Sequence, residues 1–204
     1  MSTRTVRLLG LGGLVGPVTF VAAWLAAGAA AKSYSPVDGA ISDLARTNAP
    51  TRAAMTLGFV GFGVGVIAFG LALRACGAGA ASVSAVATAC FTLAVAATPL
   101  GAPTRDVVHG AFASLGYLTL VGVPAFSARP LARAGRPGWA RASVAAAAAA
   151  ALCLLASAIG PAHGLLQRAG LTTGDLWITA VAVHLVRGRD LFEARSVTPG
   201  AQRT

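Results

Sequence analysis

The sequence predicts an all-α integral-membrane bundle of six transmembrane helices, and two properties of its composition support this fold class. Hydrophobic residues make up 56% of the 204 residues, whereas charged residues make up only 11%. Soluble domains carry about 25% charged residues, because their surface must be solvated. The mean hydropathy is +0.73. This composition excludes an ordinary cytosolic enzyme, a disordered chain and a disulfide-stapled secreted domain.

Six apolar stretches are long enough to cross about 30 Å of hydrocarbon. The first resembles a signal peptide but has too long an apolar run for one. The fifth contains the alanine run 145–151, and we expect this weakly hydrophobic helix to pack closely inside the bundle. We assign residues 1–187 to a six-helix transmembrane domain and 188–204 to a flexible cytoplasmic tail. The spans are residues 8–31, 53–73, 80–101, 108–128, 142–161 and 171–186.

The basic residues predict the orientation of these spans. With a cytoplasmic N-terminus, eleven of the sixteen basic residues fall on the inner side and five on the outer side. The positive-inside rule therefore places both termini in the cytoplasm. The Ala-, Gly- and Arg-rich composition is typical of GC-rich bacteria, so we expect a multi-pass protein of the bacterial inner (plasma) membrane. Because this distribution accounts for the net charge of +10, we expect no nucleic-acid partner.

Glycines and cysteines carry less information. Gly12 and Gly16, like Gly61 and Gly65, are spaced so that helix backbones can approach closely. Both internal packing and a homodimer through these faces remain open. The three cysteines form no CxxC pair. No spacing is specific for a metal, so we expect neither metal nor cofactor.

The longest outer segment, residues 32–52, carries the first polar cluster. Ile41, Leu44 and Ala45 fall at helical spacing and predict a short amphipathic helix. Asp43 can pair with Arg46 at i,i+3. This segment either lies as a solvated loop in the headgroup region or covers a site as a lid.

A second cluster opens the fourth span. Thr104 and Asp106 suit the N-terminus of that helix as caps. His109 lies one turn after Asp106, and a carboxylate that orients an imidazole is a common acid/base arrangement. It is equally a common structural pair. Arg105 lies beside both residues.

The third cluster runs from His163 to Trp177. If Thr172 or Thr173 caps the last span, Asp175 lies about one turn inside the membrane. A carboxylate at that depth is costly and usually faces the bundle interior with a partner. Arg168, Arg105 and His109 are the candidate partners.

These clusters resemble a known pattern, the bacterial domain-of-unknown-function 998 family. The resemblance covers nearly the whole chain. It implies a six-span membrane protein and no settled activity, so it assigns no catalytic roles. It rests on Arg7, Gly16-Pro17, Tyr34-Ser35, Ile41-Ser42-Asp43-Leu44, the Asp106/His109 pair and Gly164-Leu165-Leu166-Gln167-Arg168.

The functional hypothesis is an integral-membrane enzyme acting on a lipid or isoprenoid by acid/base chemistry. A carboxylic acid kept neutral by an apolar site can protonate a double bond and start terpene cyclisation or isomerisation. The alternatives are a non-catalytic lipid-binding or accessory subunit and a proton-coupled carrier, which the absence of mid-membrane charge disfavours. The candidate catalytic residues are Asp175, Asp106, His109 and Asp43, and the candidate substrate-binding residues are Tyr34, Arg105, His163, Arg168, Trp177 and Trp24.

Overall fold

The computed structural model describes residues 1–194, and within them the chain forms helices and no strands. Only Leu11 separates α1 from α2, and together they form one span. Within residues 1–194, six helices are long and apolar enough to cross a membrane, which confirms the predicted fold class. Residues 195–204 of the predicted tail lie outside the described residues. The helices are α1 (Thr3–Gly10), α2 (Gly12–Ala30), the 3-10 helix η1 (Ile41–Ala45), α3 (Arg52–Ala75), α4 (Gly79–Ala97), α5 (Pro103–Arg133), α6 (Pro137–Ile159) and α7 (His163–Val186).

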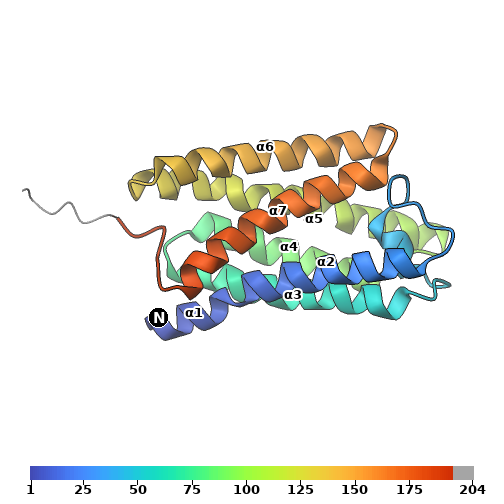
Figure 1. Cartoon of the computed structure of the whole chain (residues 1–204), viewed down its shortest axis with the longest axis horizontal. Coiled ribbons are helices and arrows are strands. Elements are labelled where there is room, and N and C mark those ends of the chain that lie inside the picture. Colours follow the sequence, from blue (N-terminus) through green and yellow to red (C-terminus); the bar gives the residue numbers. More distant parts are fainter. Residues whose placement is uncertain (195–204) are drawn as a thin grey trace, which may run out of the picture.

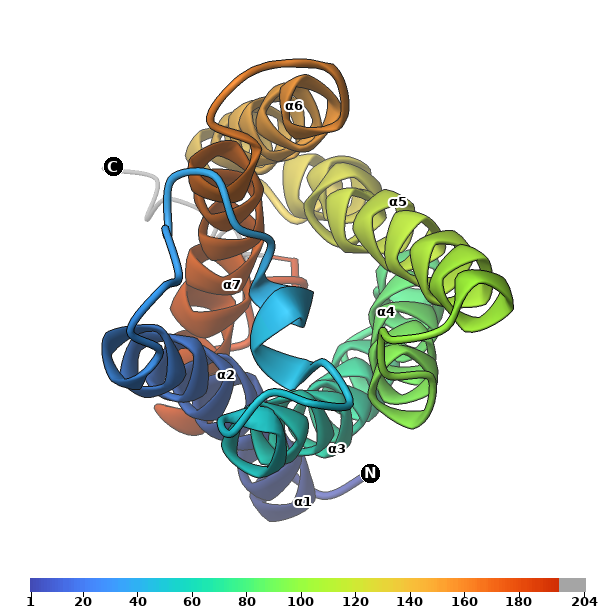
Figure 2. The same cartoon turned by 90° about the vertical axis from the view of Figure 1, so that its right-hand side faces the viewer.

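The spanning helices form a ring in chain order (Figures 1 and 2). Each of α2 to α7 packs against the next, and α7 closes the ring against α2. The helices α5 and α7 also touch each other, so α6 lies at the outer edge. In Figure 2, η1 lies over the middle of the ring. We call that end of the bundle the η1 end, and residues 31–51 the roof segment.

The glycine pairs serve packing between α2 and α3. A Cβ atom on Gly12 would lie 2.2 Å from the carbonyl oxygen of Gly65, and one on Gly65 would lie 2.7 Å from Cα of Gly16. Only glycine permits such an approach of two helix backbones. These glycines therefore allow α2 and α3 of the same chain to pack closely.

The prediction that the alanine-rich helix packs in the interior is wrong. Helix α6 buries a single stripe, formed by Ser143, Ala147, Ala150 and Leu154. The exposed fraction of Ile159 is 91%, and the leucines of its outer face are exposed as well. Small residues let one stripe approach α5 and α7 closely, but the other apolar faces of the helix suit lipid equally well.

The last span begins eight residues earlier than predicted, at His163 rather than at residue 171. Thr172 and Thr173 therefore cap nothing, and the Thr173 hydroxyl donates to the Ala169 carbonyl within the helix at 2.8 Å. Asp175 lies twelve residues into a helix of 24 residues. At the α-helical rise this is about 18 Å from the η1 end, half-way along the span. The expectation of a carboxylate one turn deep, and of no charge at mid-membrane, is thus corrected.

Helix α5 is also longer than predicted at both ends, covering Pro103–Arg133 instead of 108–128. Asp106 lies in the first turn of this helix, as the sequence predicted. The helices α5 and α7 both run away from the η1 end, so their residues can be compared by depth.

Candidate functional site

A narrow cavity lies inside the ring beneath η1, and we call it the shaft. It comprises about 560 Å³ of space between atoms, part of it open to solvent, and the centre of a water-sized molecule can occupy only about 60 Å³. Residues of α2, α3, α4, α5 and α7 form its walls, while Ile41 and Ser42 of the roof segment line its top. Most of the wall is apolar. Its polar residues in the walls are Thr88, Thr92, His109, Tyr117, Gln167 and Asp175.

Asp175 and His109 lie at different depths in the shaft. A Cβ atom on Gly174 would lie 2.8 Å from Leu120, which places Asp175 near the level of Leu120 on α5. His109 is eleven residues closer to the η1 end of α5, a rise of about 17 Å. The structure therefore puts both predicted residues in one cavity but does not bring them together at one reacting atom.

Asp175 forms the deep end of the shaft. Its exposed fraction is 3%, and among the described residues neither carboxyl oxygen has a hydrogen-bond partner. The antiparallel helix α2 meets α7 where Gly13 approaches Ala182. Seven residues towards the η1 end from this contact lie Phe20 on α2 and Asp175 on α7. The carboxyl group therefore lies at the level of a phenyl ring.

Phe20 belongs to a group of three rings in the shaft wall. Its ring centroid lies 5.7 Å from that of Phe59 and 5.3 Å from that of Phe62. All three rings line the shaft. Sequence analysis did not identify them, because phenylalanines at helical spacing are indistinguishable from ordinary core residues.

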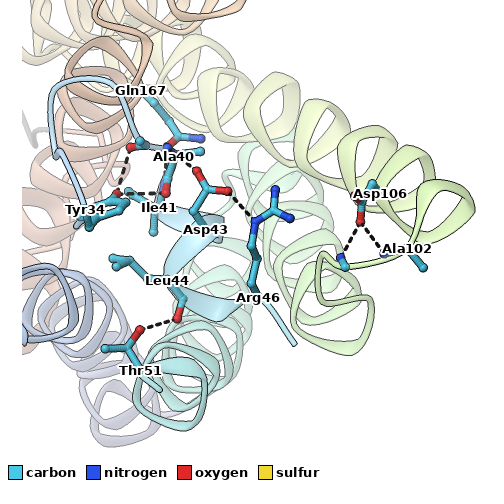
Figure 3. A network of polar contacts seen from close by, with 12 residues as sticks. Tyr34, Ala40, Ile41, Asp43, Leu44, Arg46, Thr51, Ala102, Asp106 and Gln167 are labelled. Carbon is cyan, nitrogen blue, oxygen red and sulfur yellow. Dashed lines mark hydrogen bonds and ion pairs between the residues drawn. The ribbon is translucent and has the colours of Figure 1, made fainter. Parts of the chain in front are cut away.

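His109 lies nearer the mouth, with an exposed fraction of 4%. Its Nδ1 is 2.7 Å from the Thr98 carbonyl oxygen, whereas its Nε2 has no partner among the described residues. Asp106 does not orient this ring. Its carboxylate accepts instead from the backbone N–H groups of Gly101 at 2.7 Å and Ala102 at 3.3 Å (Figure 3). Asp106 thus ties the two residues before α5 to its first turn, whereas the predicted cap by Thr104 is not formed.

Gln167 connects the shaft to the roof segment. Its Oε1 accepts from the Ile41 N–H at 2.9 Å, and its Nε2 donates to the Tyr117 hydroxyl. The sequence pattern alone assigned no role to Gln167 beyond the family resemblance. A glutamine inside an apolar span was the available signal, but it was placed in a loop because the start of α7 was predicted too late.

Arg168 fastens the roof segment to α7. Its Nη1 donates to the carbonyl oxygens of Pro36 at 2.9 Å, Gly39 at 3.0 Å and Gly164 at 2.8 Å, and its Nη2 donates to the Tyr34 hydroxyl. The guanidinium lies 5.3 Å from the Trp24 ring centroid and 5.4 Å from that of Tyr34. The predicted binding residues Trp24, Tyr34 and Arg168 therefore meet in one cluster outside the shaft.

Because the Arg168 guanidinium is held in this cluster, it does not pair with the Asp175 carboxyl group, and the predicted pairing of the two is wrong. Burial raises the pKa of the Tyr34 phenol, and the hydrogen bond and charge of Arg168 offset part of that rise. The phenol is therefore neutral at physiological pH and donates to the carbonyl oxygens of Gly39 and Ala40, each at 2.9 Å.

The short helix η1 packs on the bundle. Ile41 and Leu44 are 2% and 1% exposed, so the segment covers the shaft rather than lying in headgroups. Asp43 accepts from the Ala40 N–H at 3.0 Å and pairs with Arg46 at 3.1 Å, which confirms the predicted i,i+3 contact (Figure 3). Asp43 does not line the shaft.

The remaining predicted site residues lie elsewhere. Arg105 and His163 are exposed in the first turns of α5 and α7. Trp177 is buried between α6 and α7, where its Nε1 donates to Ser143 Oγ at 3.0 Å. Within residues 1–194, no group of three His, Cys, Asp or Glu side chains is placed to hold a metal ion.

The sequence was compared with known protein families, curated proteins and solved structures. A family model described as "Protein of unknown function (DUF998)" matches residues 14–184. The chain belongs to this family. The matched part of this DUF998 protein includes the roof segment and every residue that lines the shaft. None of the curated proteins or solved structures matches it.

Proposed function

We propose that this DUF998 protein is an integral-membrane enzyme that acts by acid/base chemistry on the apolar end of an isoprenoid or another unsaturated lipid. The supporting observation is the Asp175 carboxyl group at the bottom of a narrow apolar shaft, with no partner for either oxygen among the described residues. A carboxyl group at mid-membrane needs a partner. Its partner is then a proton, a ligand, or both in turn.

The chemistry requires only this one carboxyl group. In its acid form, Asp175 transfers its proton to one carbon of a C=C bond, and the π electrons form the new C–H bond. The neighbouring carbon becomes a cation, which the ring faces of Phe20, Phe59 and Phe62 stabilise. The carboxylate then removes a proton from an adjacent carbon. This step restores the acid and leaves a lipid with a shifted double bond.

The small volume of the shaft favours isomerisation over terpene cyclisation. Cyclisation begins with the same protonation, but the chain must then fold back on itself. A cavity in which the centre of a water-sized molecule can occupy only about 60 Å³ leaves little room for such folding. The substrate class supported here is thus an extended unsaturated chain that enters from the η1 end.

A second candidate function is a proton-coupled carrier, because an unpaired mid-span carboxyl group is typical of proton and ion pathways. Below Asp175, however, Ile178 and Val181 are fully buried and Leu185 is 2% exposed. This packing closes the shaft on the side away from η1. A non-catalytic lipid-binding subunit would use the same shaft but would not need Asp175.

The test is a comparison of lipid products in D₂O. Membranes containing the wild type, Asp175→Asn or Asp106→Asn are supplied with farnesyl- and geranylgeranyl-bearing lipids and analysed by mass spectrometry. We expect an isomer carrying one added deuterium from the wild type and from Asp106→Asn, whose amide oxygen can still accept the capping hydrogen bonds. Asp175→Asn should form none.

The opposite results separate the alternatives. If no deuterated isomer forms while all three proteins are folded, the enzyme proposal is refuted. In that case, lipid flux in proteoliposomes that depends on the pH gradient and is lost in Asp175→Asn would identify a carrier. Lipid that co-purifies equally with the wild type and Asp175→Asn would identify a binding subunit.

A further inference from the structure

The orientation of the Gln167 amide follows from its partner in the roof segment. The Ile41 N–H is a backbone donor, so the group 2.9 Å away must be the amide oxygen Oε1. The Nε2 of the same amide therefore faces Tyr117 and donates to its hydroxyl oxygen (Figure 3 shows the Gln167–Ile41 end). The direction of this second hydrogen bond is thus fixed by the first.

The Tyr117 hydroxyl consequently has a proton to donate elsewhere. Its oxygen accepts from Gln167, so its own O–H bond points away from that amide. Among the described residues no hydrogen bond takes up this proton, and Tyr117 lines the shaft. A hydroxyl donor without an acceptor in apolar surroundings is costly. The arrangement is complementary to an acceptor oxygen on a molecule inside the shaft.

The shaft also defines the charge of that molecule. Among the residues that the structure describes, no lysine or arginine lines the shaft. The nearest buried cation along α7, Arg168, is directed at the carbonyl oxygens of Pro36 and Gly39. A phosphate or diphosphate group at this depth would lack a counter-charge, whereas a neutral oxygen needs only the one donor.

We propose that Tyr117, positioned by Gln167, binds the neutral oxygen of a single-chain lipid: an alcohol, ether, ester or carbonyl. The tail of this lipid runs down the shaft to Asp175. Gln167 and Asp175 are eight residues apart on α7, a rise of about 12 Å between their backbones, so the reacting carbon lies several bonds along the tail from the oxygen. The direction of the tail rests on the proposed function, whereas the oxygen site does not.

The test uses saturated ligands, on which Asp175 cannot act. Binding of lauryl alcohol, lauryl methyl ether and tridecane to the purified full chain in nanodiscs is measured by competition. In the wild type we expect the alcohol and the ether to bind roughly three- to tenfold more tightly than the hydrocarbon, the range for one neutral hydrogen bond. The ether is decisive, because it accepts a hydrogen bond but cannot donate one.

Two variants locate the effect. In Tyr117→Phe all three ligands should bind within about twofold of one another. Thr92→Val is the matched control. Thr92 also lines the shaft, but its hydroxyl already donates to the Thr88 carbonyl at 2.9 Å, so the preference should persist. A wild type that binds the ether no better than tridecane would overturn the inference without any variant, as would a preference that survives Tyr117→Phe.

The two proposals fail separately. Asp175→Asn should retain the preference for the ether, because the oxygen site lies about 12 Å away. If deuterium incorporation is absent but the preference holds, the enzyme proposal falls and the oxygen site stands. If deuterium is incorporated but the preference is absent, the oxygen site falls and the enzyme proposal stands.

Discussion

Replacement of Gly164 by alanine should lift the roof segment without removing any polar group. Gly164 is in the first turn of α7. An added Cβ atom would lie 2.3 Å from the Gly39 carbonyl oxygen and 2.9 Å from that of Pro36. Ordinary van der Waals contact begins at 3.4 Å, so the Gly39 carbonyl must move by about an ångström.

That displacement acts on the contacts that hold the roof segment. Leu165 N–H donates to Val37 at 2.9 Å, and Arg168 donates to Pro36 and Gly39 at 2.9 and 3.0 Å. Overpacking of this kind costs about 1–3 kcal/mol. If the roof segment opens locally, its open population should increase roughly five- to 150-fold, since about 1.4 kcal/mol corresponds to a factor of ten.

The assay is limited trypsin digestion in nanodiscs, followed at the peptide bond after Arg46, which lies on the exposed side of η1. When opening is fast relative to cleavage, the cleavage rate follows the open population. Gly110→Ala is the matched control. Gly110 is helical, and an added Cβ atom would meet nothing within 4 Å, so cleavage should not accelerate. Equal cleavage of Gly164→Ala and the wild type would refute the reasoning.

Three further predictions concern side chains and orientation. Trp177→Phe should lower the free energy of unfolding by about 1 kcal/mol in thermal unfolding, because the hydrogen bond to Ser143 is lost. The affinity for ligands, measured by competition binding, should not change. Because the pKa of Tyr34 is raised in the folded protein, this phenol should stabilise the fold fully below pH about 10, and the stabilisation should be lost as the pH rises through the raised pKa. Melting curves at increasing pH should show this loss in the wild type but not in Tyr34→Phe. In a background without native cysteines, Val37→Cys should react with an impermeant maleimide in intact cells, whereas Arg187→Cys should react only after permeabilisation; the reverse would invert the proposed orientation.

Hydropathy was sufficient to predict the number of spans and the fold class, because both depend on the total apolar length. It failed at the start of α7, where Gln167 and Arg168 suggested a loop. Gln167 bonds instead to the roof segment and to Tyr117, and the terminal nitrogens of Arg168 bond to the roof segment. A sequence does not reveal such internal partners, so the depth of Asp175 was predicted incorrectly.

The candidate site was predictable only in part. Asp175 and His109 stood out as ionisable groups near apolar segments, and the structure places both in the shaft wall. Asp106 and Asp43 stood out for the same reason, yet they bond to neighbouring backbone N–H groups at helix ends. Spacing along the chain cannot distinguish a carboxylate that accepts hydrogen bonds from nearby backbone N–H groups from one that faces a cavity.

The position of α6 separates the helix that covers the outside of the bundle from the helices that form the wall of the shaft. The shaft is walled by α2, α3, α4, α5 and α7, and none of its lining residues belongs to α6. Because α5 and α7 also touch each other directly, α6 covers their outer side. Substitutions among its exposed apolar residues, such as Leu152, Leu155 and Ile159, can therefore adapt the protein to bilayers of different thickness while the wall of the shaft stays unchanged.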